Sequence, residues 1–202
     1  MIKNIIFDMG NVLVRFDPYY ILDQHDIKDP DDISLLMENI FNSEGWSKMD
    51  LGIYIEDDLY NEAITKLPKR LHKTAREILD TWYESLTPIK GIKELITDLK
   101  KKDLHIYLLS NAGKSKDIYW NSIPAHECFD GGIVSAFVGC VKPDRKIFDI
   151  LLKKYGLKAE ECVFTDDMNR NIDAARSLGI NAFLFEGDVE ALRRYIFEFL
   201  DK

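Results

Sequence analysis

Hydrophobic residues follow two different patterns along the chain, and the change of pattern divides it. In residues 17–86 the apolar positions recur at helical spacing, with no convincing strand. Within residues 31–41, for example, one helical face collects five apolar side chains, namely Ile33, Leu36, Met37, Ile40 and Phe41. Asp31 and Asp32 favour the start of this helix, because acidic side chains stabilise a helix N-terminus. The same spacing predicts two more helices in this segment, over residues 56–67 and 70–82.

After residue 88, short apolar runs alternate with amphipathic helical segments. Strands are predicted over residues 104–109, 133–136, 162–165 and 182–185. Helices are predicted over residues 92–102, 143–155 and 169–178, and from residue 189 onward. Alternation of this kind is typical of a parallel sheet with helices on both faces. The apolar run at residues 2–7 is a further strand of the same type.

The predicted fold is therefore α/β, a doubly wound and mainly parallel sheet with an inserted helical cap lobe. The first strand belongs with the strands that come after residue 88, so the helical segment interrupts the sheet. We expect residues 1–16 and 87–202 to form the core and residues 17–86 to form the lobe. A lobe inserted directly after the first strand could close over chemistry at the strand ends.

Composition and charge restrict the class of protein and its partners. The chain has 202 residues and a formal charge of −8, with acidic residues spread along its length. This charge argues against nucleic acid or an anionic membrane as the main partner. The sequence has no long uncharged apolar run, and we expect Met1 to lead straight into a strand rather than into a signal peptide.

Cysteine usage is the remaining compositional signal. Cys128, Cys140 and Cys162 are odd in number and lack Cys-x-x-Cys spacing, and the histidines show no ligand spacing either. A disulfide framework or a zinc site is therefore not expected. We expect a protein of the reducing cytoplasm, with no nucleic-acid or membrane partner and no obligate protein partner.

Polar residues with candidate chemistry follow the predicted strands or begin a predicted helix. Four such groups occur, in the chain order Asp8, Ser110–Asn111, Lys142 and Asp166–Asp167. Because the carboxyl ends of parallel strands meet at one edge of a sheet, we expect these groups to gather in one site. A nucleophilic carboxylate, a hydroxyl, a lysine and paired carboxylates together predict a site for phosphoryl transfer.

Each group has an ordinary structural explanation as well. Adjacent carboxylates such as Asp166 and Asp167 repel each other unless a cation is present, and Mg²⁺ prefers carboxylate oxygens, but Asp166 could instead cap the helix that follows. Ser110 and Asn111 offer a hydroxyl and backbone amides to a phosphate group, yet Ser-Asn at a turn is also a common helix cap. Lys142, directly before a proline, can place a point charge on a phosphate, although most lysines face solvent.

The four groups resemble the four motifs of the haloacid dehalogenase-like hydrolase superfamily, in the same order and from Asp8 to Asp167. The first motif, Asp-x-Gly-Asn-Val, is similar to that of a sugar-phosphatase branch containing glucose-1-phosphatase. The resemblance implies a Rossmann-like core with a helical cap. It also implies a Mg²⁺-dependent phosphatase that acts on a small-molecule phosphate ester, which in that branch is a sugar phosphate.

The resemblance further implies a role for each matching residue. Asp8 would be the nucleophile that forms an aspartyl-phosphate, and Lys142 would be the second catalytic residue. Ser110, Asn111 and Gly10 would bind the phosphate group of the substrate. The expected ligands of Mg²⁺ are Asp8, Asp167, the backbone carbonyl of Gly10 and, directly or through water, Asp166.

Gly10 departs from the pattern of the superfamily. Most of its phosphatases have a second Asp at this position, which protonates the leaving alcohol and then activates water. Glycine cannot transfer a proton, and proton transfer contributes roughly two to four orders of magnitude to such reactions. Asp17, shortly downstream, is a candidate replacement, although a helix cap at the start of the lobe is the simpler explanation.

Some residues of the lobe could contact a substrate. They are predicted on a loop between two helices and comprise Trp46, Lys48, Met49, Asp50 and Gly52. A tryptophan and polar groups on such a loop could select a sugar-like leaving group, and core packing is the alternative for Trp46. Three aromatic residues are expected in the core or at its rim, namely Tyr119, Trp120 and Phe129.

Two other functions are compatible with these residues. A 2-haloacid dehalogenase would use Asp8 to displace halide from carbon without a metal, whereas the pair Asp166–Asp167 favours a metal and hence phosphate. A non-catalytic or weakly active phosphate-binding regulatory module would be consistent with Gly10. Mg²⁺-dependent hydrolysis of a phosphate monoester through Asp8 is the function that the sequence favours.

Overall fold

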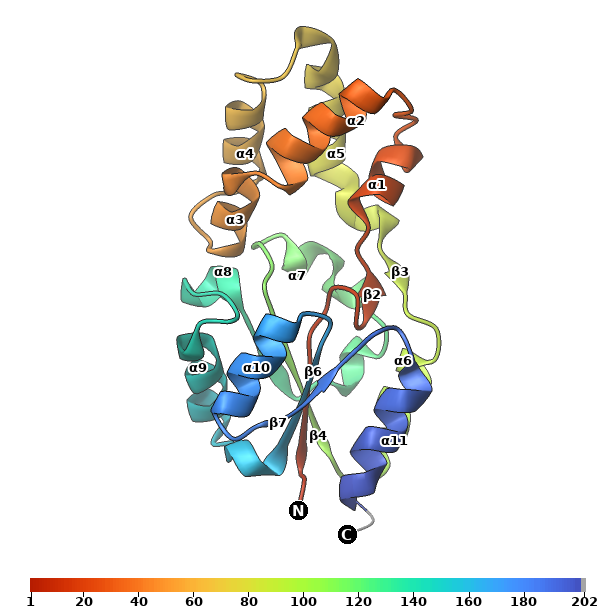
Figure 1. Cartoon of the computed structure of the whole chain (residues 1–202), viewed down its shortest axis with the longest axis vertical. Helices are drawn as coiled ribbons and strands as arrows, with labels where there is room; N and C mark the ends of the chain where they lie inside the picture. Colours follow the sequence, from red (N-terminus) through yellow and green to blue (C-terminus); the bar gives the residue numbers. More distant parts are fainter. Residues whose placement is uncertain (201–202) are drawn as a thin grey trace.

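The computed structural model describes residues 1–200 and has an α/β core beneath a group of helices (Figure 1). A five-stranded parallel sheet forms the centre, in the order β5-β4-β1-β6-β7. The strands are β1 Asn4–Phe7, β4 His105–Ser110, β5 Gly131–Val134, β6 Cys162–Asp166 and β7 Asn181–Leu184. The predicted doubly wound, mainly parallel sheet is confirmed.

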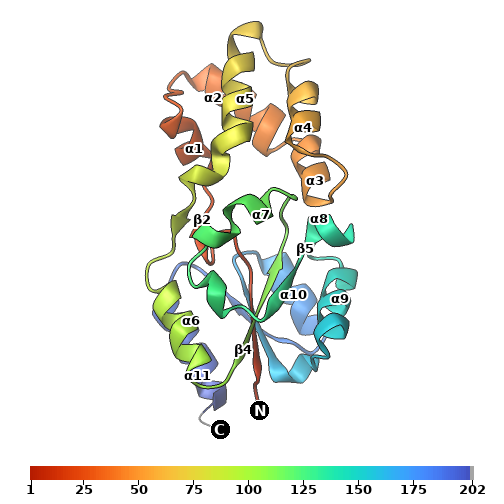
Figure 2. The same ribbon diagram turned by 180° about the vertical axis from the view of Figure 1, so that it is seen from behind.

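Helices cover both faces of the sheet, because alternate residues of its buried strands point to opposite sides. On β1, for example, Ile5 and Phe7 belong to one hydrophobic cluster and Ile6 to the other. The two pairs of helices that cover the faces (Figures 1 and 2) are α6 Ile92–Lys100 with α11 Val189–Leu200, and α9 Arg145–Tyr155 with α10 Asn169–Ser177. No helix within residues 1–200 has the length and apolar character needed to cross a membrane.

A second group of helices, which we call the cap, stands beyond the carboxyl ends of the strands (Figure 1). Its members are α1 Pro18–Gln24, α2 Pro30–Leu36, α3 Glu44–Asp50, α4 Glu56–Ala63 and α5 His72–Thr81. Four aromatic rings at or next to the base of the cap pack with centroids 5.2 to 6.3 Å apart, namely Phe16, Phe41, Trp46 and Trp82. This packing joins the chain entering the cap to helices within it.

Two connections lead from the core to the cap and back. They pair as a short antiparallel ribbon, β2 (Val14–Arg15) with β3 (Thr87–Pro88). The division of the chain that we expect at residues 16/17 and 86/87 falls directly beside this ribbon. Strands of two residues have no visible periodicity, so the sequence pattern does not predict the ribbon.

The strand expected over residues 133–136 is wrong in its second half. β5 ends at Val134, and a short helix, α8 (Ser135–Val138), follows at once. β5 also begins earlier than expected, with two glycines. A Cβ on Gly132 would lie 2.6 Å from the Cβ of Leu108 on β4, so the close approach of these strands requires glycine. A Gly-Gly pair resembles a turn in sequence, which hides the start of this strand.

Helical segments differ from expectation as well, and the helix expected over residues 56–67 ends at Ala63. The helix expected over residues 143–155 begins at Arg145 rather than at Pro143, because the carboxylate of Asp144 accepts from the backbone N–H of Lys146 and caps the helix there. Four residues of the lobe that we expect on a loop lie instead in α3, namely Trp46, Lys48, Met49 and Asp50. The hydroxyl of Ser43 accepts from the backbone N–H of Trp46 at the N-terminus of this helix.

Candidate active site

The carboxyl ends of the central strands bring the predicted residues together. Asp8 follows β1 directly, and Asp166 is the last residue of β6. The two strands pair in parallel, with Phe7 opposite Thr165, and the backbone N–H of Asp8 donates to the carbonyl oxygen of Thr165 at 2.9 Å. Ser110 ends β4 on the other side of β1. The sheet topology therefore places all three residues at one edge.

Lys142 connects two carboxylates of this edge. Its ammonium Nζ lies 2.7 Å from Oδ1 of Asp8 and 2.6 Å from Oδ2 of Asp166. All three side chains are buried, and only 1% of the Lys142 side chain is exposed. Burial disfavours the ammonium form, but the charges of the two carboxylates outweigh burial and raise the pKa of Lys142. Lys142 is therefore positively charged at neutral pH.

Opposing effects act on the pKa of the Asp8 carboxyl group. Its pKa is raised to about 7, first by burial and also by the charge of Asp166, while Lys142 acts in the opposite direction. A nucleophilic carboxylate must be ionised. A further positive charge at the site would favour the ionised form of Asp8, because an opposite charge nearby stabilises a carboxylate.

Hydrogen bonds occupy both oxygens of Asp166. Nδ2 of Asn171 donates to Oδ1 at 2.9 Å and to Oδ2 at 3.0 Å, and the backbone N–H of Met168 donates to Oδ1 at 2.8 Å. With Lys142 on Oδ2, these contacts fix the orientation of the carboxylate. Asp166 therefore both orders the turn before α10 and belongs to the site.

Asp167 is half-buried and is held by Asn11. Nδ2 of Asn11 donates to Oδ2 of Asp167 at 3.1 Å, and Oδ1 of Asn11 accepts from the backbone N–H of Phe16 at 3.0 Å. Burial raises the pKa of Asp167, although the hydrogen bond from Asn11 opposes this. Sequence reasoning did not single out Asn11, because asparagine in a turn is too common to indicate a site.

Three carboxylates at this edge can reach a common point. One oxygen each of Asp8, Asp166 and Asp167 lies within 4.8 Å of the others. Their charges repel one another, and Lys142 contributes only a single positive charge. An all-oxygen donor set of this charge fits a hard divalent cation such as Mg²⁺. That the carbonyl of Gly10, in the turn after Asp8, supplies a further ligand stays a prediction.

Ser110 and Asn111 lie beside this cluster and line a pocket. The side chain of Ser110 is buried. The side chain of Asn111 is hydrogen-bonded to the backbone of Lys142, so it holds the residue whose ammonium contacts Asp8. That Ser110 and Asn111 bind a phosphate group stays a prediction.

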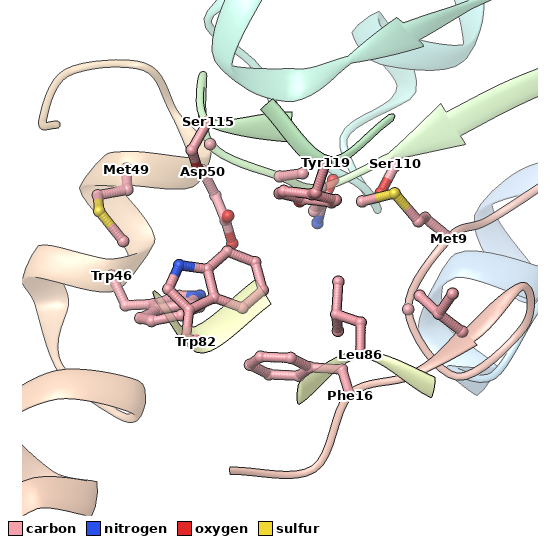
Figure 3. Close-up of a pocket in the computed structure, with 15 residues that line it drawn as sticks. Met9, Phe16, Trp46, Met49, Asp50, Trp82, Leu86, Ser110, Ser115 and Tyr119 are labelled. Atoms are coloured by element: carbon pink, nitrogen blue, oxygen red, sulfur yellow. The ribbon is translucent and has the colours of Figure 1, made fainter. Parts of the chain in front are cut away.

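The pocket lies between the cap and the core and has an empty volume of about 550 Å³, part of it open to solvent (Figure 3). Its walls are mainly aromatic and aliphatic. On the cap side and its connections they comprise Val14, Phe16, Trp46, Met49, Trp82 and Leu86. Tyr119, at the end of α7 (Lys116–Tyr119), adds another ring, while Met9 and Gly10 contribute the turn after β1.

Asp50 brings a carboxylate into this apolar pocket. It is the last residue of α3 and is half-buried, and its carboxylate makes no hydrogen bond or ion pair with any of residues 1–200. Its pKa is raised to about 7, first by burial and then by the charge of Asp8, against an opposing effect of Lys142. Tyr119 lines the same pocket, and burial raises the pKa of its hydroxyl well above the usual range.

Two residues considered from the sequence are engaged elsewhere. Asp17 caps α1, because its carboxylate accepts from the backbone N–H groups of Tyr19 and Tyr20. Of the two roles considered for Asp17, the structure therefore has the helix cap. Nζ of Lys48 is 3.3 Å from the hydroxyl oxygen of Tyr54, and Lys48 does not line the pocket.

The aromatic residues are divided between the core and the pocket. Trp46 and Tyr119 pack against other rings and also line the pocket. Trp120 and Phe129 pack against each other and the core. The pocket residues that the sequence did not indicate include Phe16, Trp82 and Leu86. They lie where the lobe joins the core, and helical spacing does not show which side chains at such a junction face a pocket.

Comparison with known proteins gives consistent similarities. Residues 5–185 match a family described as haloacid dehalogenase-like hydrolase. A sesquiterpene phosphatase of Aspergillus oryzae is 30% identical over 184 residues, which are 88% of this chain and 87% of that protein. A D-ribitol-5-phosphate phosphatase of Bacteroides thetaiotaomicron is 25% identical and covers 91% of each chain.

Solved structures show the same fold. A haloacid dehalogenase-family enzyme of Bacteroides thetaiotaomicron, in complex with magnesium and inorganic phosphate, has a TM-score of 0.76 at 19% identity, over 95% of this chain and 99% of that chain. An L-2-haloacid dehalogenase of Xanthobacter autotrophicus has a TM-score of 0.67 at 17% identity, over 98% of this chain and 83% of that chain. At these identities the likeness concerns the fold alone.

Proposed function

The chain belongs to the haloacid dehalogenase-like hydrolase family, and from that premise we propose that it is a Mg²⁺-dependent phosphatase acting through an aspartyl-phosphate on Asp8. Its phosphatase relatives identify it as a hydrolase of phosphoric monoesters. The resemblance to the superfamily found in the sequence is thereby confirmed. The likeness to the branch containing glucose-1-phosphatase stays a prediction.

One observation carries the proposal. Lys142 joins Asp8 to Asp166 by ion pairs of 2.7 and 2.6 Å, and Asp167 completes a group of three carboxylates within 4.8 Å. A purely structural role would not require a lysine buried against the carboxylate that follows the first strand. The arrangement supports a nucleophile held next to a cation site.

The proposed reaction gives each of these residues a role. An oxygen of Asp8 attacks phosphorus, the new bond forms as the ester P–O bond breaks, and water then cleaves the aspartyl-phosphate to release phosphate. Lys142 stabilises negative charge on Asp8 and on the phosphoryl oxygens, and the hydroxyl of Ser110 donates to one of those oxygens. Asp8, Asp166 and Asp167 would hold Mg²⁺ with the carbonyl of Gly10. When bound, the ion supplies the positive charge that lets a phosphate dianion approach three carboxylates.

The lining of the pocket favours a substrate whose leaving group is an apolar alcohol. Rings of Trp46, Trp82 and Tyr119 line it, and apolar walls with a few polar groups are typical of small-molecule sites. Transfer of an aliphatic chain from water into such surroundings is favourable, because it removes apolar surface from water. The relative named as a sesquiterpene phosphatase supports the same class. We therefore infer that the substrate is a prenyl-like or other aliphatic phosphate monoester.

A sugar phosphate, which the sequence predicted, is the second candidate. Asp50 favours it, because a carboxylate in the pocket can accept hydrogen bonds from sugar hydroxyls. The relative named as a D-ribitol-5-phosphate phosphatase supports this class as well.

A panel of substrates separates these classes. Farnesyl phosphate, ribitol 5-phosphate and glucose 1-phosphate are compared by phosphate release, with Mg²⁺ and after exhaustive chelation. We expect turnover only with Mg²⁺ and the highest kcat/KM with farnesyl phosphate. A preference for the sugar phosphates would replace the apolar class by the second candidate. Halide release from 2-chloropropionate without metal would contradict phosphatase chemistry and favour a dehalogenase.

Replacing Asp8 tests the covalent route. Asp8→Asn should lower turnover by about four orders of magnitude or more, since an amide does not form the acyl-phosphate. Asp173→Asn on the exposed side of α10 is the matched control and should keep wild-type activity. Residual activity of Asp8→Asn within tenfold of wild type would exclude Asp8 as the nucleophile. One equivalent of product from wild type without further turnover would instead support a regulatory phosphate-binding module.

Location and macromolecular partners stay predictions. The substrate is a small phosphate ester, and the expectation of no nucleic-acid, membrane or obligate protein partner rests on charge and composition. The cytoplasmic location rests on cysteine usage.

A further inference from the structure

The proposed reaction needs a proton at the oxygen that leaves phosphorus, and the turn after β1 does not supply one. Gly10 has no side chain, and Asp17 is occupied as the cap of α1. Alkoxide leaving groups depart slowly without a proton, and water attacks an acyl-phosphate faster when a base removes its proton. Another group that faces the pocket must perform both transfers.

We propose that Asp50 of the cap is this acid and base. The inference rests on the proposed phosphatase function and assigns a step of it to the cap. Asp50 would donate a proton to the ester oxygen as the bond between phosphorus and that oxygen breaks and the Asp8–phosphorus bond forms. Its carboxylate would then take a proton from the water molecule whose oxygen attacks phosphorus and displaces Asp8. The released phosphate leaves Asp50 protonated for the next cycle.

The composition of the pocket wall supports the choice of Asp50. The lining contains two side chains that titrate as acids, Asp50 and Tyr119. The hydroxyl of Tyr119 is a very weak acid here, because burial raises its pKa far above neutrality. The carboxylate of Asp50 extends from α3 into the pocket, which Trp82 also lines (Figure 3). It has no hydrogen bond or ion pair within residues 1–200, so its oxygens are available to a substrate.

The charges around Asp50 suit both transfers. The ionisable groups that interact with it electrostatically are Asp8, Lys142 and Tyr119. Burial and the charge of Asp8 favour its neutral form, whereas Lys142 favours the ionised form, and the resulting pKa is about 7. A group that is half protonated at neutral pH can serve as the acid in one step and as the base in the next.

Gly52 holds this end of α3 against the core. Its φ is +72°, and a Cβ at this position would lie 2.0 Å from the carbonyl oxygen of Ala136. The backbone of the cap therefore rests directly on the backbone of α8, with no space for a side chain. Asp50 lies two residues before this contact, so the contact fixes its distance from the core. We infer that Gly52 is a positioning residue for Asp50.

Asp50→Asn is the test of the acid and base role, with Glu44→Gln, an exposed residue of the same helix, as the control. We expect kcat/KM for an alkyl phosphate to fall about 10²- to 10⁴-fold. With p-nitrophenyl phosphate, whose leaving group needs little protonation, we expect a rapid burst of one equivalent of nitrophenolate followed by slow turnover. Phosphate trapped on Asp8 should accumulate during the slow phase, and Glu44→Gln should behave like wild type.

The outcomes separate this inference from the proposed function. If Asp50→Asn keeps steady-state turnover within about threefold of wild type on both substrates, while Asp8→Asn is inactive, Asp50 is not the acid and base and the phosphatase function stands. If wild type itself forms no phosphate adduct on Asp8 and releases no phosphate, the proposed function fails. Equal losses on alkyl and aryl phosphates without a burst would also overturn the inference, because they indicate a general defect.

Gly52→Ala tests the positioning role, with Gly156→Ala as the matched control. Gly156 also has a positive φ, +65°, but a Cβ there meets no atom within 4 Å, so it reproduces the backbone strain without the collision. We expect Gly52→Ala, and not Gly156→Ala, to lose turnover on alkyl phosphates selectively. Added to Asp50→Asn, Gly52→Ala should cause no further loss, because both act through one carboxylate. Additive losses would show a general effect on the cap and overturn the assignment of Gly52.

Discussion

Asn111 holds the backbone of Lys142 at both of its polar groups. Nδ2 of Asn111 donates to the carbonyl oxygen of Lys142 at 3.0 Å, and Oδ1 accepts from its backbone N–H at 2.7 Å. The turn after β4 is thereby joined to the segment that precedes α9. Since the ammonium of Lys142 lies between Asp8 and Asp166, a shift of its backbone would move the charge that both carboxylates share.

Asn111→Ala should therefore affect the position of Lys142. We expect kcat to fall about 10- to 100-fold, because displacements of about 1 Å in an active site have effects of this size. The free energy of unfolding should fall by about 1–2 kcal/mol through the two lost hydrogen bonds. Steady-state kinetics and urea denaturation measure the two effects, and Asn121→Ala at an exposed position is the control. Unchanged kcat with a raised KM would instead indicate that Asn111 acts only as a phosphate ligand.

Lys142→Met should make the stability of the protein depend on metal. The substitution leaves Asp8 and Asp166 buried without their shared positive charge, and breaking a buried pair in this way costs about 3–5 kcal/mol. We expect a loss of that size in urea denaturation with chelator, and a larger stabilisation by Mg²⁺ than in wild type. Lys146→Met on the exposed side of α9 should show neither effect. Equal stabilisation of all three proteins by Mg²⁺ would mean that Lys142 and the metal act on different groups.

The central part of the site could be predicted from the sequence because it depends on local sequence patterns at the ends of strands. An apolar run that ends in Asp8, and another that ends in Asp166, each mark the end of a buried strand. In a parallel sheet such ends meet at one edge, whatever the order of the strands. The partners of Lys142 follow less directly, since its ion pairs depend on how the segment before α9 crosses that edge.

The cap side of the site could not be predicted in the same way. α3 was expected to be a loop, because Gly45 and the polar residues around it leave too few apolar positions for a helical pattern. The place of Asp50 depends on how the cap rests on α8, and local sequence does not encode the close contact between Gly52 and Ala136. The pocket exists only once this docking has occurred.

Gly10→Asp tests whether position 10 can take over proton transfer. A Cβ on Gly10 would meet only the Cβ of Phe16, at 3.9 Å, and its φ lies outside the left-handed region, so the fold should tolerate the change. In wild type we expect little gain on alkyl phosphates, because Asp50 already supplies the proton. In the Asp50→Asn background we expect Gly10→Asp to restore alkyl phosphate turnover at least tenfold, in line with the usual size of proton-transfer effects, about 10²-fold or more.

Two results would contradict this expectation. A large gain from Gly10→Asp in wild type would mean that the site lacks an acid and base altogether. An equal loss on alkyl and aryl phosphates in both backgrounds would mean that the new carboxylate disturbs the metal ligands, and the stability of the variant in urea would show whether the fold is affected too.

The pKa of Asp50 predicts how stability changes with pH. In the folded protein this pKa is about 7, and in the unfolded chain it is near the ordinary value of 3.8. Between about pH 4 and pH 7 the folded state therefore holds a proton that the unfolded state has lost. The free energy of unfolding must fall as pH rises through this window, because the folded state then binds more protons than the unfolded state.

Asp50→Asn removes this dependence, since an amide does not titrate. We expect the variant to gain stability relative to wild type as pH rises from about 4 to 7, with no further gain above that window. A full shift corresponds to about 1.4 kcal/mol per pKa unit, and partial exposure of Asp50 reduces the expected gain to about 1–3 kcal/mol. Urea denaturation of both proteins in chelator across this pH range measures it, and Glu44→Gln should parallel wild type. A constant difference between Asp50→Asn and wild type would mean that Asp50 is ionised in the folded protein well below neutrality, and it could not then supply the proton.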